Sequence, residues 1–138
     1  MILLDTSGLL AWIDEGQRSH REILEIMASV EGPYLLSPFV LAELDYLLST
    51  RVGRAAQEQF LAEVGQGSVR LELFRASDVA RALEIVRKFG DLDMGVADAS
   101  LVVLAERHQC QNILTLDSRH FRVLDANRKP FRLLPADA

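Results

Sequence analysis

The sequence predicts a three-layer α/β/α domain with a mostly parallel central sheet. Short stretches of almost continuously apolar residues are typical of strands that are buried on both faces. Longer segments with helical spacing lie between them, and such alternation indicates parallel strands joined by right-handed helical crossovers. The length of 138 residues fits one compact domain, which we expect to span residues 1–138.

Four stretches are predicted to be strands, and a fifth is a further candidate. In chain order they are residues 1–4, 34–36, 69–74, 112–116 and 131–134. The third differs from the others, because Val69, Leu71 and Leu73 alternate with charged residues, as in a half-exposed edge strand.

Six segments have helical spacing, and several carry recognisable start or stop signals. They are residues 8–14, 19–30, 38–51, 54–64, 77–89 and 95–108. Ser19 followed by Glu22 has the pattern of a capping box. Pro38 suits the first helical position after Ser37, and Gly90 follows the end of its helix.

Composition excludes several classes of protein. Hydrophobic residues make up 49% and charged residues 25%, which is ordinary for a globular domain and excludes general disorder. The lone cysteine, Cys110, excludes an internal disulfide framework. No stretch approaches a membrane span or a secretion leader, so we expect a cytoplasmic protein without a membrane partner. The net charge of −5, taken alone, argues against a nucleic acid partner.

Two acids stand directly after predicted strands. Asp5 follows the first strand and Asp117 follows the fourth. In parallel α/β sheets, ligands bind beyond the carboxyl ends of the strands, so both acids are expected at the functional edge. Each also has a structural interpretation as a helix cap or turn residue, as do Thr6 and Ser7 near Asp5.

Glu43 is predicted to project from an apolar stripe. Its neighbours at helical spacing are Phe39, Val40, Tyr46 and Leu47. A charged carboxylate in such a place requires a compensating cation. The alternative is a residue at the margin of the stripe that reaches water.

Asp98 also shares a helix face with apolar residues. Leu101, Val102 and Ala105 follow it at helical spacing. It lies in the first helical turn, where the macrodipole favours an acid for purely structural reasons. Asp91 and Asp93 in the preceding loop are expected to be solvated, and the alternative for Asp93 is a place in the lining of the same cleft.

Together, Asp5, Glu43, Asp98 and Asp117 predict a metal site. Four carboxylates in one cleft repel one another and raise some pKa values unless a cation is bound. Oxygen ligands favour Mg²⁺ or Mn²⁺ over zinc. Two such ions can activate a water molecule and stabilise the leaving oxygen of a phosphodiester.

Four motifs in order resemble a known family. LLDTSGLLA, SPFVLAELDYLL, GVADASLVVLAE and ILTLDSRHF are similar to the motifs of PIN-domain ribonucleases, and the size and single-domain layout are similar to the VapC toxins of type II toxin–antitoxin pairs. The resemblance extends from Ile2 to about Pro135. It implies a parallel sheet flanked by helices.

The resemblance also implies roles for particular residues and partners. Asp5 and Asp98 match the principal Mg²⁺ ligands, and Glu43 and Asp117 complete the cluster directly or through water. Hydroxyls of Thr6 or Ser7 and of Thr115 match groups that orient the acids. The family hydrolyses single-stranded or looped RNA, and VapC toxins cut tRNA or ribosomal RNA to halt translation. They generally form homodimers, and a small VapB antitoxin silences them, its tail occupying the active-site groove.

The segment after Asp117 is basic. Arg119, Arg122 and Arg128 are expected to contact RNA beside the cleft, and the alternative is a solvated tail. His120 is not expected to be a ligand or a general base, because metal-bound water needs no histidine base. Arg51 and Arg54 are candidates for a second basic rim.

Two other functions remain open at this stage. In an Asp-based phosphotransfer domain, Asp5 would itself accept phosphate, but this requires a second acid near Asp5 or a lysine after a late strand. The only lysines, Lys88 and Lys129, end no predicted strand. In a non-catalytic binding module, the acids would only cap helices and no metal would bind.

Overall fold

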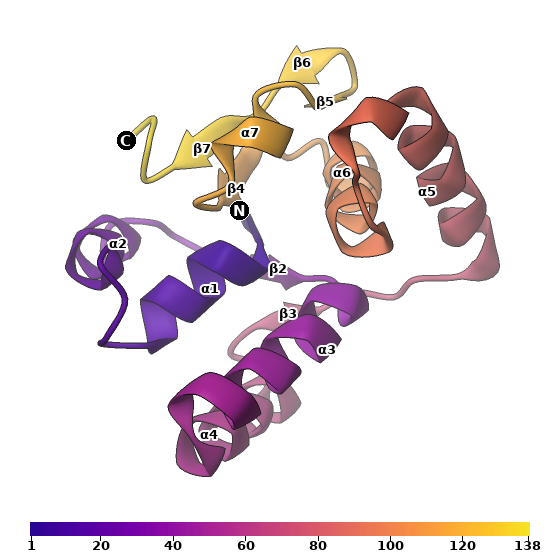
Figure 1. Cartoon of the computed structure of the whole chain (residues 1–138). Coiled ribbons are helices and arrows are strands. Elements are labelled where there is room, and N and C mark those ends of the chain that lie inside the picture. Colours follow the sequence, from indigo (N-terminus) through magenta and orange to yellow (C-terminus); the bar gives the residue numbers. More distant parts are fainter.

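A computed structural model describes all 138 residues and confirms the α/β/α architecture (Figure 1). The central sheet has five strands in the order β3-β2-β1-β4-β7, and every pairing is parallel. The strands are β1 (Ile2–Leu4), β2 (Tyr34–Leu36), β3 (Arg70–Leu71), β4 (Asn112–Leu114) and β7 (Arg132–Leu134). A separate antiparallel hairpin consists of β5 (Asp125–Ala126) and β6 (Lys129–Pro130).

All six predicted helices form, within a few residues of the expected bounds. The six are α1 (Thr6–Ile13), α2 (His20–Met27), α3 (Pro38–Leu47), α4 (Arg54–Gln66), α5 (Ala76–Lys88) and α6 (Val96–His108). A seventh, short helix that was not predicted is α7 (Ser118–Phe121). The segment predicted as one helix over 38–51 changes at Leu48 into a π-helical turn, η1 (Leu48–Val52). Elsewhere, a 3₁₀ turn, η2 (Gly90–Leu92), precedes α6. No helix has the length and apolar character that crossing a membrane requires.

The sheet order brings distant parts of the chain to one edge. β1 lies at the centre, and Leu3 is in register with Leu35 of β2 and Ile113 of β4. Because the strands are parallel, the residues that follow them, Asp5 after β1 and Thr115 after β4, meet at the same edge. From β1 the chain continues to β2 and β3 on one side, and then returns to β4 and β7 on the other side of β1. The strand order therefore reverses beside β1, at this same edge.

The core is one continuous cluster of 33 buried apolar residues, running from Ile2 to Leu134. β1 is fully buried, as the continuous apolar run predicts. α6 is buried from Ala99 to Ala105 because it packs between β1, α3 and α5; Figure 1 shows α5 and α6 side by side. Each fully buried leucine contributes on the order of 2 kcal/mol, so this cluster fixes the helices that carry the acids.

The edge strand differs from the prediction. β3 has only two residues. Leu71 and Leu73 are 46% and 71% exposed, although the alternating pattern predicts that both side chains face the core together with Val69. Glu72 takes the inner position instead: its side chain is only 10% exposed, because it forms ion pairs with Arg70 and His108. The paired charges allow a polar residue to occupy this side.

One of the two predicted cap motifs is present. The Ser37 hydroxyl accepts a hydrogen bond from the Phe39 amide at 3.2 Å, with Pro38 in the first turn as expected. The predicted capping box of Ser19 and Glu22 is wrong, because the Ser19 side chain makes no cap hydrogen bond.

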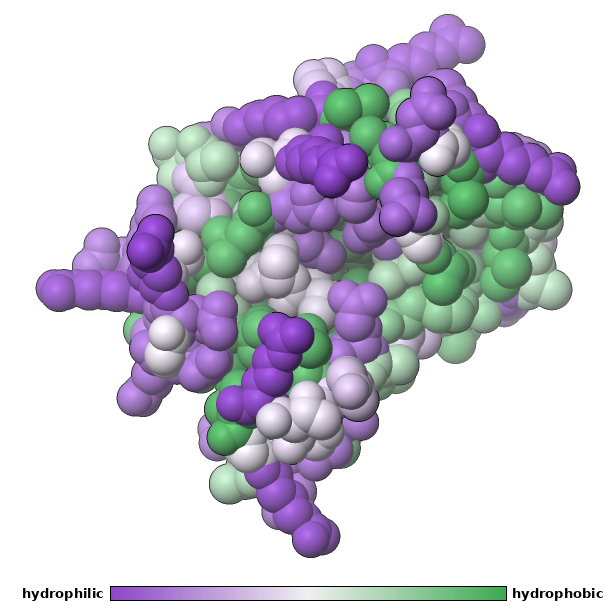
Figure 2. Space-filling view, viewed as in Figure 1, coloured by the Kyte–Doolittle hydropathy of each residue, from purple (hydrophilic) through white to green (hydrophobic).

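Polar residues cover most of the face seen in Figure 2, with apolar areas between them. One apolar area lies on the side of α5 and α6, in agreement with the 45% and 46% exposure of Val79 and Leu83 on α5.

Candidate active site

A cleft of about 670 Å³ opens at the carboxyl edge of the sheet. The start of α1, one side of α3 from Phe39 to Leu47 and the first turn of α6 form its walls. The structure brings all four predicted acids into it: the lining includes Asp5, Glu43, Asp98 and Asp117. Neither Asp91 nor Asp93 is among its lining residues, and both are exposed, as expected for solvated loop acids.

Asp5 is held at the floor of the cleft by two hydroxyls. Its Oδ2 accepts hydrogen bonds from Thr115 Oγ1 at 2.7 Å and Ser7 Oγ at 2.9 Å. It makes no cap hydrogen bond to α1, so the cap interpretation of this residue is wrong. Burial raises the pKa of Asp5, and the two hydroxyl hydrogen bonds offset this effect only in part.

The two hydroxyls are themselves fixed by the chain after β4. Thr115 Oγ1 accepts from the Asp117 amide at 2.9 Å, and Ser7 Oγ accepts from the Leu116 amide at 2.9 Å. The carboxylate of β1 is therefore tied to the end of β4, and the orientation of Asp5 depends on the register of these two strands.

Asp98 stands in the first turn of α6 and faces the other acids. Burial, together with the negative charges of Asp5, Asp117 and Glu43, raises the pKa of Asp98 to about 6, against the lowering effect of His120. The helix that carries it is anchored by a buried contact between Ser100 Oγ and Ser37 Oγ at 2.6 Å. This contact joins the starts of α3 and α6 and fixes the width of the cleft.

Asp117 combines two roles that the sequence presented as alternatives. Its Oδ1 accepts the His120 amide at 3.1 Å and so caps α7. Its Oδ2 lies 3.0 Å from Nδ1 of the His120 ring, which also lies 3.2 Å from Asp98 Oδ2. His120 is thus next to two acids of the cluster, a position that its sequence context did not predict.

Glu43 reaches the cleft from its rim. It is exposed, contrary to the expected projection from an apolar stripe. The buried stripe of the helix is made by Val40, Leu44 and, in the following π-helical turn, Leu48, and Glu43 lies beside it. Its charge contributes to the raised pKa of Asp98, so the four acids act on one another.

The donor set fits a divalent cation. Hard carboxylate oxygens predominate, and oxygen or nitrogen atoms of Asp98, Asp117 and His120 lie within 4.8 Å of one another. Two buried polar atoms in this region, Thr6 Oγ1 and His120 Nδ1, have no hydrogen-bond partner. A raised pKa at Asp98 and at Asp5 is what uncompensated negative charge in a partly dry cleft produces.

The basic residues expected beside the cleft are distributed differently. Arg119 is exposed on α7, directly after Asp117. Arg122 is bound to Asp137 through two hydrogen bonds of 2.8 and 2.6 Å. Arg128 is in the β5–β6 hairpin, which packs against the last turns of α6. The Asn127 side chain in this hairpin donates to the Glu106 carbonyl, so the hairpin lies at the opposite end of α6 from Asp98. The expectation that Arg128 flanks the cleft is therefore wrong.

Arg51 supplies the basic group that Arg128 does not. It stands in the π-helical turn η1 and lines the cleft. Arg54, the second residue considered for this rim, is paired with Glu58 at 2.9 Å.

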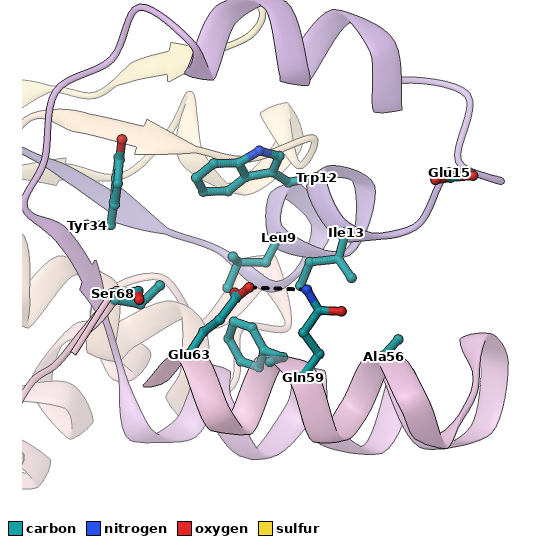
Figure 3. A pocket seen from close by; sticks show the side chains of 11 residues that line it. Leu9, Trp12, Ile13, Glu15, Tyr34, Ala56, Gln59, Glu63 and Ser68 are labelled. Atoms are coloured by element: carbon teal, nitrogen blue, oxygen red, sulfur yellow. Dashed lines mark hydrogen bonds between the residues drawn. The ribbon is translucent and has the colours of Figure 1, made fainter. Parts of the chain in front are cut away.

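A second hollow of about 600 Å³ lies outside the acidic cleft, between α1 and α4 (Figure 3). In Figure 3, Leu9, Trp12 and Ile13 extend from α1, and Gln59 and Glu63 extend from α4. Seven of its eleven lining residues are hydrophobic, and Trp12 packs edge-on against Tyr34 with ring centres 5.6 Å apart. We call this hollow the α1/α4 groove.

The comparisons with known proteins all indicate the same family. The PIN domain pattern matches residues 2–127. The chain is 42% identical over 123 residues to Ribonuclease VapC26 of Mycobacterium tuberculosis. The aligned residues make up 89% of this chain and 91% of the relative.

Solved structures agree with this result. The fold matches Mycobacterium tuberculosis VapC20, described as a toxin that cleaves the sarcin–ricin loop, with a TM-score of 0.80 and 25% identity over 86% of this chain and 91% of that one. FitAcB from Neisseria gonorrhoeae has the same fold, with a TM-score of 0.55 and 18% identity over 79% of this chain and 83% of that one. The chain therefore belongs to the PIN-domain family and, within it, to the VapC group.

Proposed function

We propose that this protein is a Mg²⁺- or Mn²⁺-dependent endoribonuclease toxin that cuts a loop of tRNA or ribosomal RNA and so inhibits translation in the cytoplasm. The single observation that carries the proposal is the convergence of four carboxylates, with a raised pKa at Asp98, in a cleft at the carboxyl edge of a PIN-domain sheet. The similarity to a ribonuclease and to a toxin that cleaves a ribosomal RNA loop supports RNA as the substrate.

Asp5, Glu43, Asp98 and Asp117 would hold the divalent cation or pair of cations. When bound, the cation lowers the pKa of a water molecule and stabilises the leaving oxygen of the phosphodiester. The protein's own part is to fix the carboxylates: Ser7 and Thr115 donate to the inner oxygen of Asp5, so the oxygen that remains can face the cleft.

The RNA backbone would approach over the rim of the cleft. Arg51, which lines the cleft, and Arg119, which is exposed on α7 two residues after Asp117, are the basic residues that would contact phosphates. A cation in the cleft offsets part of the acidic net charge where the phosphate must approach.

A small VapB-type antitoxin is the proposed partner, and a homodimer, assembled with antitoxin into a heterotetramer or larger complex, is the proposed oligomeric state. The α1/α4 groove supports a protein partner, because apolar side chains there, including Trp12, line a hollow open to solvent. Emission of Trp12, the only tryptophan, should shift to shorter wavelength when a cognate antitoxin covers the groove.

Purified protein incubated with total RNA and Mg²⁺ or Mn²⁺, followed by mapping of the cleavage ends, tests the activity. We expect cuts at a few defined sites, no cuts in the presence of a chelator, and none with Asp98→Asn. Asp125→Asn is the matched control, because it removes an exposed carboxylate of β5 that lies outside the cleft. Cleavage that persists in Asp98→Asn would overturn the proposal.

A further inference from the structure

His120 is held against the acidic cluster with only 16% of its side chain exposed. Its ring nitrogen Nδ1 lies 3.0 Å from Asp117 Oδ2 and 3.2 Å from Asp98 Oδ2. The ring is therefore in direct contact with two groups that would hold the cation of the proposed function.

The other ring nitrogen identifies where the proton sits. Nε2 lies 2.8 Å from the backbone carbonyl oxygen of Leu92, in the η2 turn. A carbonyl can only accept a hydrogen bond, so Nε2 must donate, and in the neutral imidazole this leaves the lone pair on Nδ1. A histidine whose far nitrogen donates to a backbone carbonyl is oriented as metal-ligating histidines usually are.

The lone pair of Nδ1 has no protein partner. The atom is buried and forms no hydrogen bond. A lone pair beside two carboxylate oxygens is repelled by them unless a positive charge lies between the three atoms.

The separations fit a cation in that position. Adjacent ligands of an octahedral ion, each about 2.1 Å from the metal, are separated by about 3.0 Å. The two distances from Nδ1 agree with this edge, and the three candidate ligand atoms lie within 4.8 Å of one another.

We propose that Nδ1 of His120 is a direct ligand of the cation bound by Asp98 and Asp117, and that this nitrogen makes the site prefer Mn²⁺ over Mg²⁺. The inference rests on the proposed metal site and adds a residue and a selectivity to it. An imidazole moves an all-oxygen site toward first-row transition ions, because Mg²⁺ strongly favours oxygen ligands. The Leu92 carbonyl is the positioning group that keeps the ring in this tautomer.

The decisive measurement is pulsed electron paramagnetic resonance of Mn²⁺ bound to the full chain after removal of metals with a chelator. Wild-type protein should show coupling to one histidine nitrogen, and the coupling pattern should change when histidine is labelled with ¹⁵N. This readout needs neither a variant nor activity, so it holds even if a substitution at position 120 prevents folding.

Variants then assign the nitrogen. His120→Asn should lose the coupling and bind Mn²⁺ about 10- to 100-fold more weakly, with a smaller loss for Mg²⁺. His20→Asn and His108→Asn are matched controls, because these histidines contact the Ala11 carbonyl and Glu72, away from the cluster, and both should keep coupling and affinity.

Two results would overturn the inference, and they are distinguishable. If Mn²⁺ binds to wild-type protein without nitrogen coupling, and His120→Asn keeps its affinity, His120 is not a ligand while the carboxylate site of the proposed function stands. If neither Mn²⁺ nor Mg²⁺ binds to wild-type protein, the metal site itself fails and the inference fails with it.

Discussion

At the scale of single residues, Asp117 explains why its sequence context was ambiguous. One carboxylate oxygen caps α7 and the other faces the cleft, so the structural and the functional interpretation are both correct. Asp5 differs: its side chain accepts hydrogen bonds from the hydroxyls of Ser7 and Thr115, which orient it, and makes no cap hydrogen bond to α1.

Replacing Asp5 with asparagine should raise the melting temperature of the metal-free protein while abolishing cleavage. Burial and the charge of Asp117 raise the pKa of Asp5, so its charged form destabilises the metal-free fold at neutral pH. Asparagine keeps an oxygen to accept from Ser7 and Thr115 but carries no charge. Cleavage should fall by a factor of about 10³ or more, as for groups that act as a unit.

Differential scanning calorimetry in chelator checks the stability of Asp5→Asn, with Asp125→Asn as the variant that removes an exposed charge. A lower melting temperature for Asp5→Asn than for wild-type protein would show that the carboxylate is not under repulsion, and would contradict a shared carboxylate site.

At the scale of elements, α1 can start beside Asp5 only because Gly8 lets it approach β4. A Cβ atom on Gly8 would lie 2.5 Å from the Leu114 carbonyl oxygen, a contact with backbone that cannot move away freely. The same approach brings Ser7 within reach of Asp5 and Thr115, so packing and site geometry depend on one small residue.

Gly8→Ala should therefore lower the free energy of unfolding by about 1–3 kcal/mol and reduce cleavage, because α1 must move away from β4. Gly65→Ala is the matched control: no atom lies within 4 Å of its added Cβ, and it sits inside α4, where alanine is favoured by about 0.5–1 kcal/mol. Urea denaturation compares the two. Equal stability of Gly8→Ala and wild-type protein would contradict the close approach.

Near the end of the chain, Arg122 and Asp137 form an ion pair whose strength depends on pH, and we call this ion pair the clamp. The guanidinium of Arg122 on α7's C-terminal side holds the pKa of Asp137 down to about 2, and the Leu133 amide also donates to this carboxylate. A depressed pKa contributes stability that is present above the unfolded value near 4 and is lost as pH falls toward 2. Wild-type protein should thus lose its advantage over Asp137→Asn between about pH 4 and pH 2 in thermal melts.

The clamp also separates two roles for Arg122. If Arg122 acts only in the clamp, Arg122→Ala and Asp137→Asn should lower the melting temperature alike at pH 7 and leave RNA cleavage unchanged. Cleavage that falls in Arg122→Ala but not in Asp137→Asn would instead indicate contact with RNA.

The elements show which features a sequence can predict and which it cannot. Ile2 to Leu4 and Leu35 to Leu36 are buried, so the continuous apolar character of these two strands identified them. Leu71 and Leu73 were misplaced, because the inner position of β3 depends on an ion pair between Glu72 and His108, 36 residues apart. Periodicity carries no information about such a partner.

The same limit applies to the candidate site. The positions of Asp5 and Asp117 follow from where strands end, and sequence order supplied that information. His120 was missed because its orientation depends on the Leu92 carbonyl, which the η2 turn brings from 28 residues away. Its spacing of three from Asp117 on a helical turn was the available signal.

At the scale of the whole molecule, the fold concentrates negative charge in the cleft and leaves the binding of phosphate to a few arginines. The net charge is −5, and the acids that face one another across the cleft come from β1, α3, α6 and the end of β4. Cation binding should accordingly stabilise the entire domain, by about 2.7 kcal/mol at a cation concentration 100 times its dissociation constant.

The span of the core predicts how the molecule unfolds. One buried cluster includes residues from β1 near the N-terminus to β7 near the C-terminus, so we expect residues 1–138 to unfold as a single cooperative unit. Trp12 on α1 and far-UV circular dichroism of all helices should report the same urea midpoint, and the calorimetric and van't Hoff enthalpies should agree. Two separated transitions in metal-free protein would contradict a single domain, because a cluster this continuous leaves no part of the sheet to persist alone.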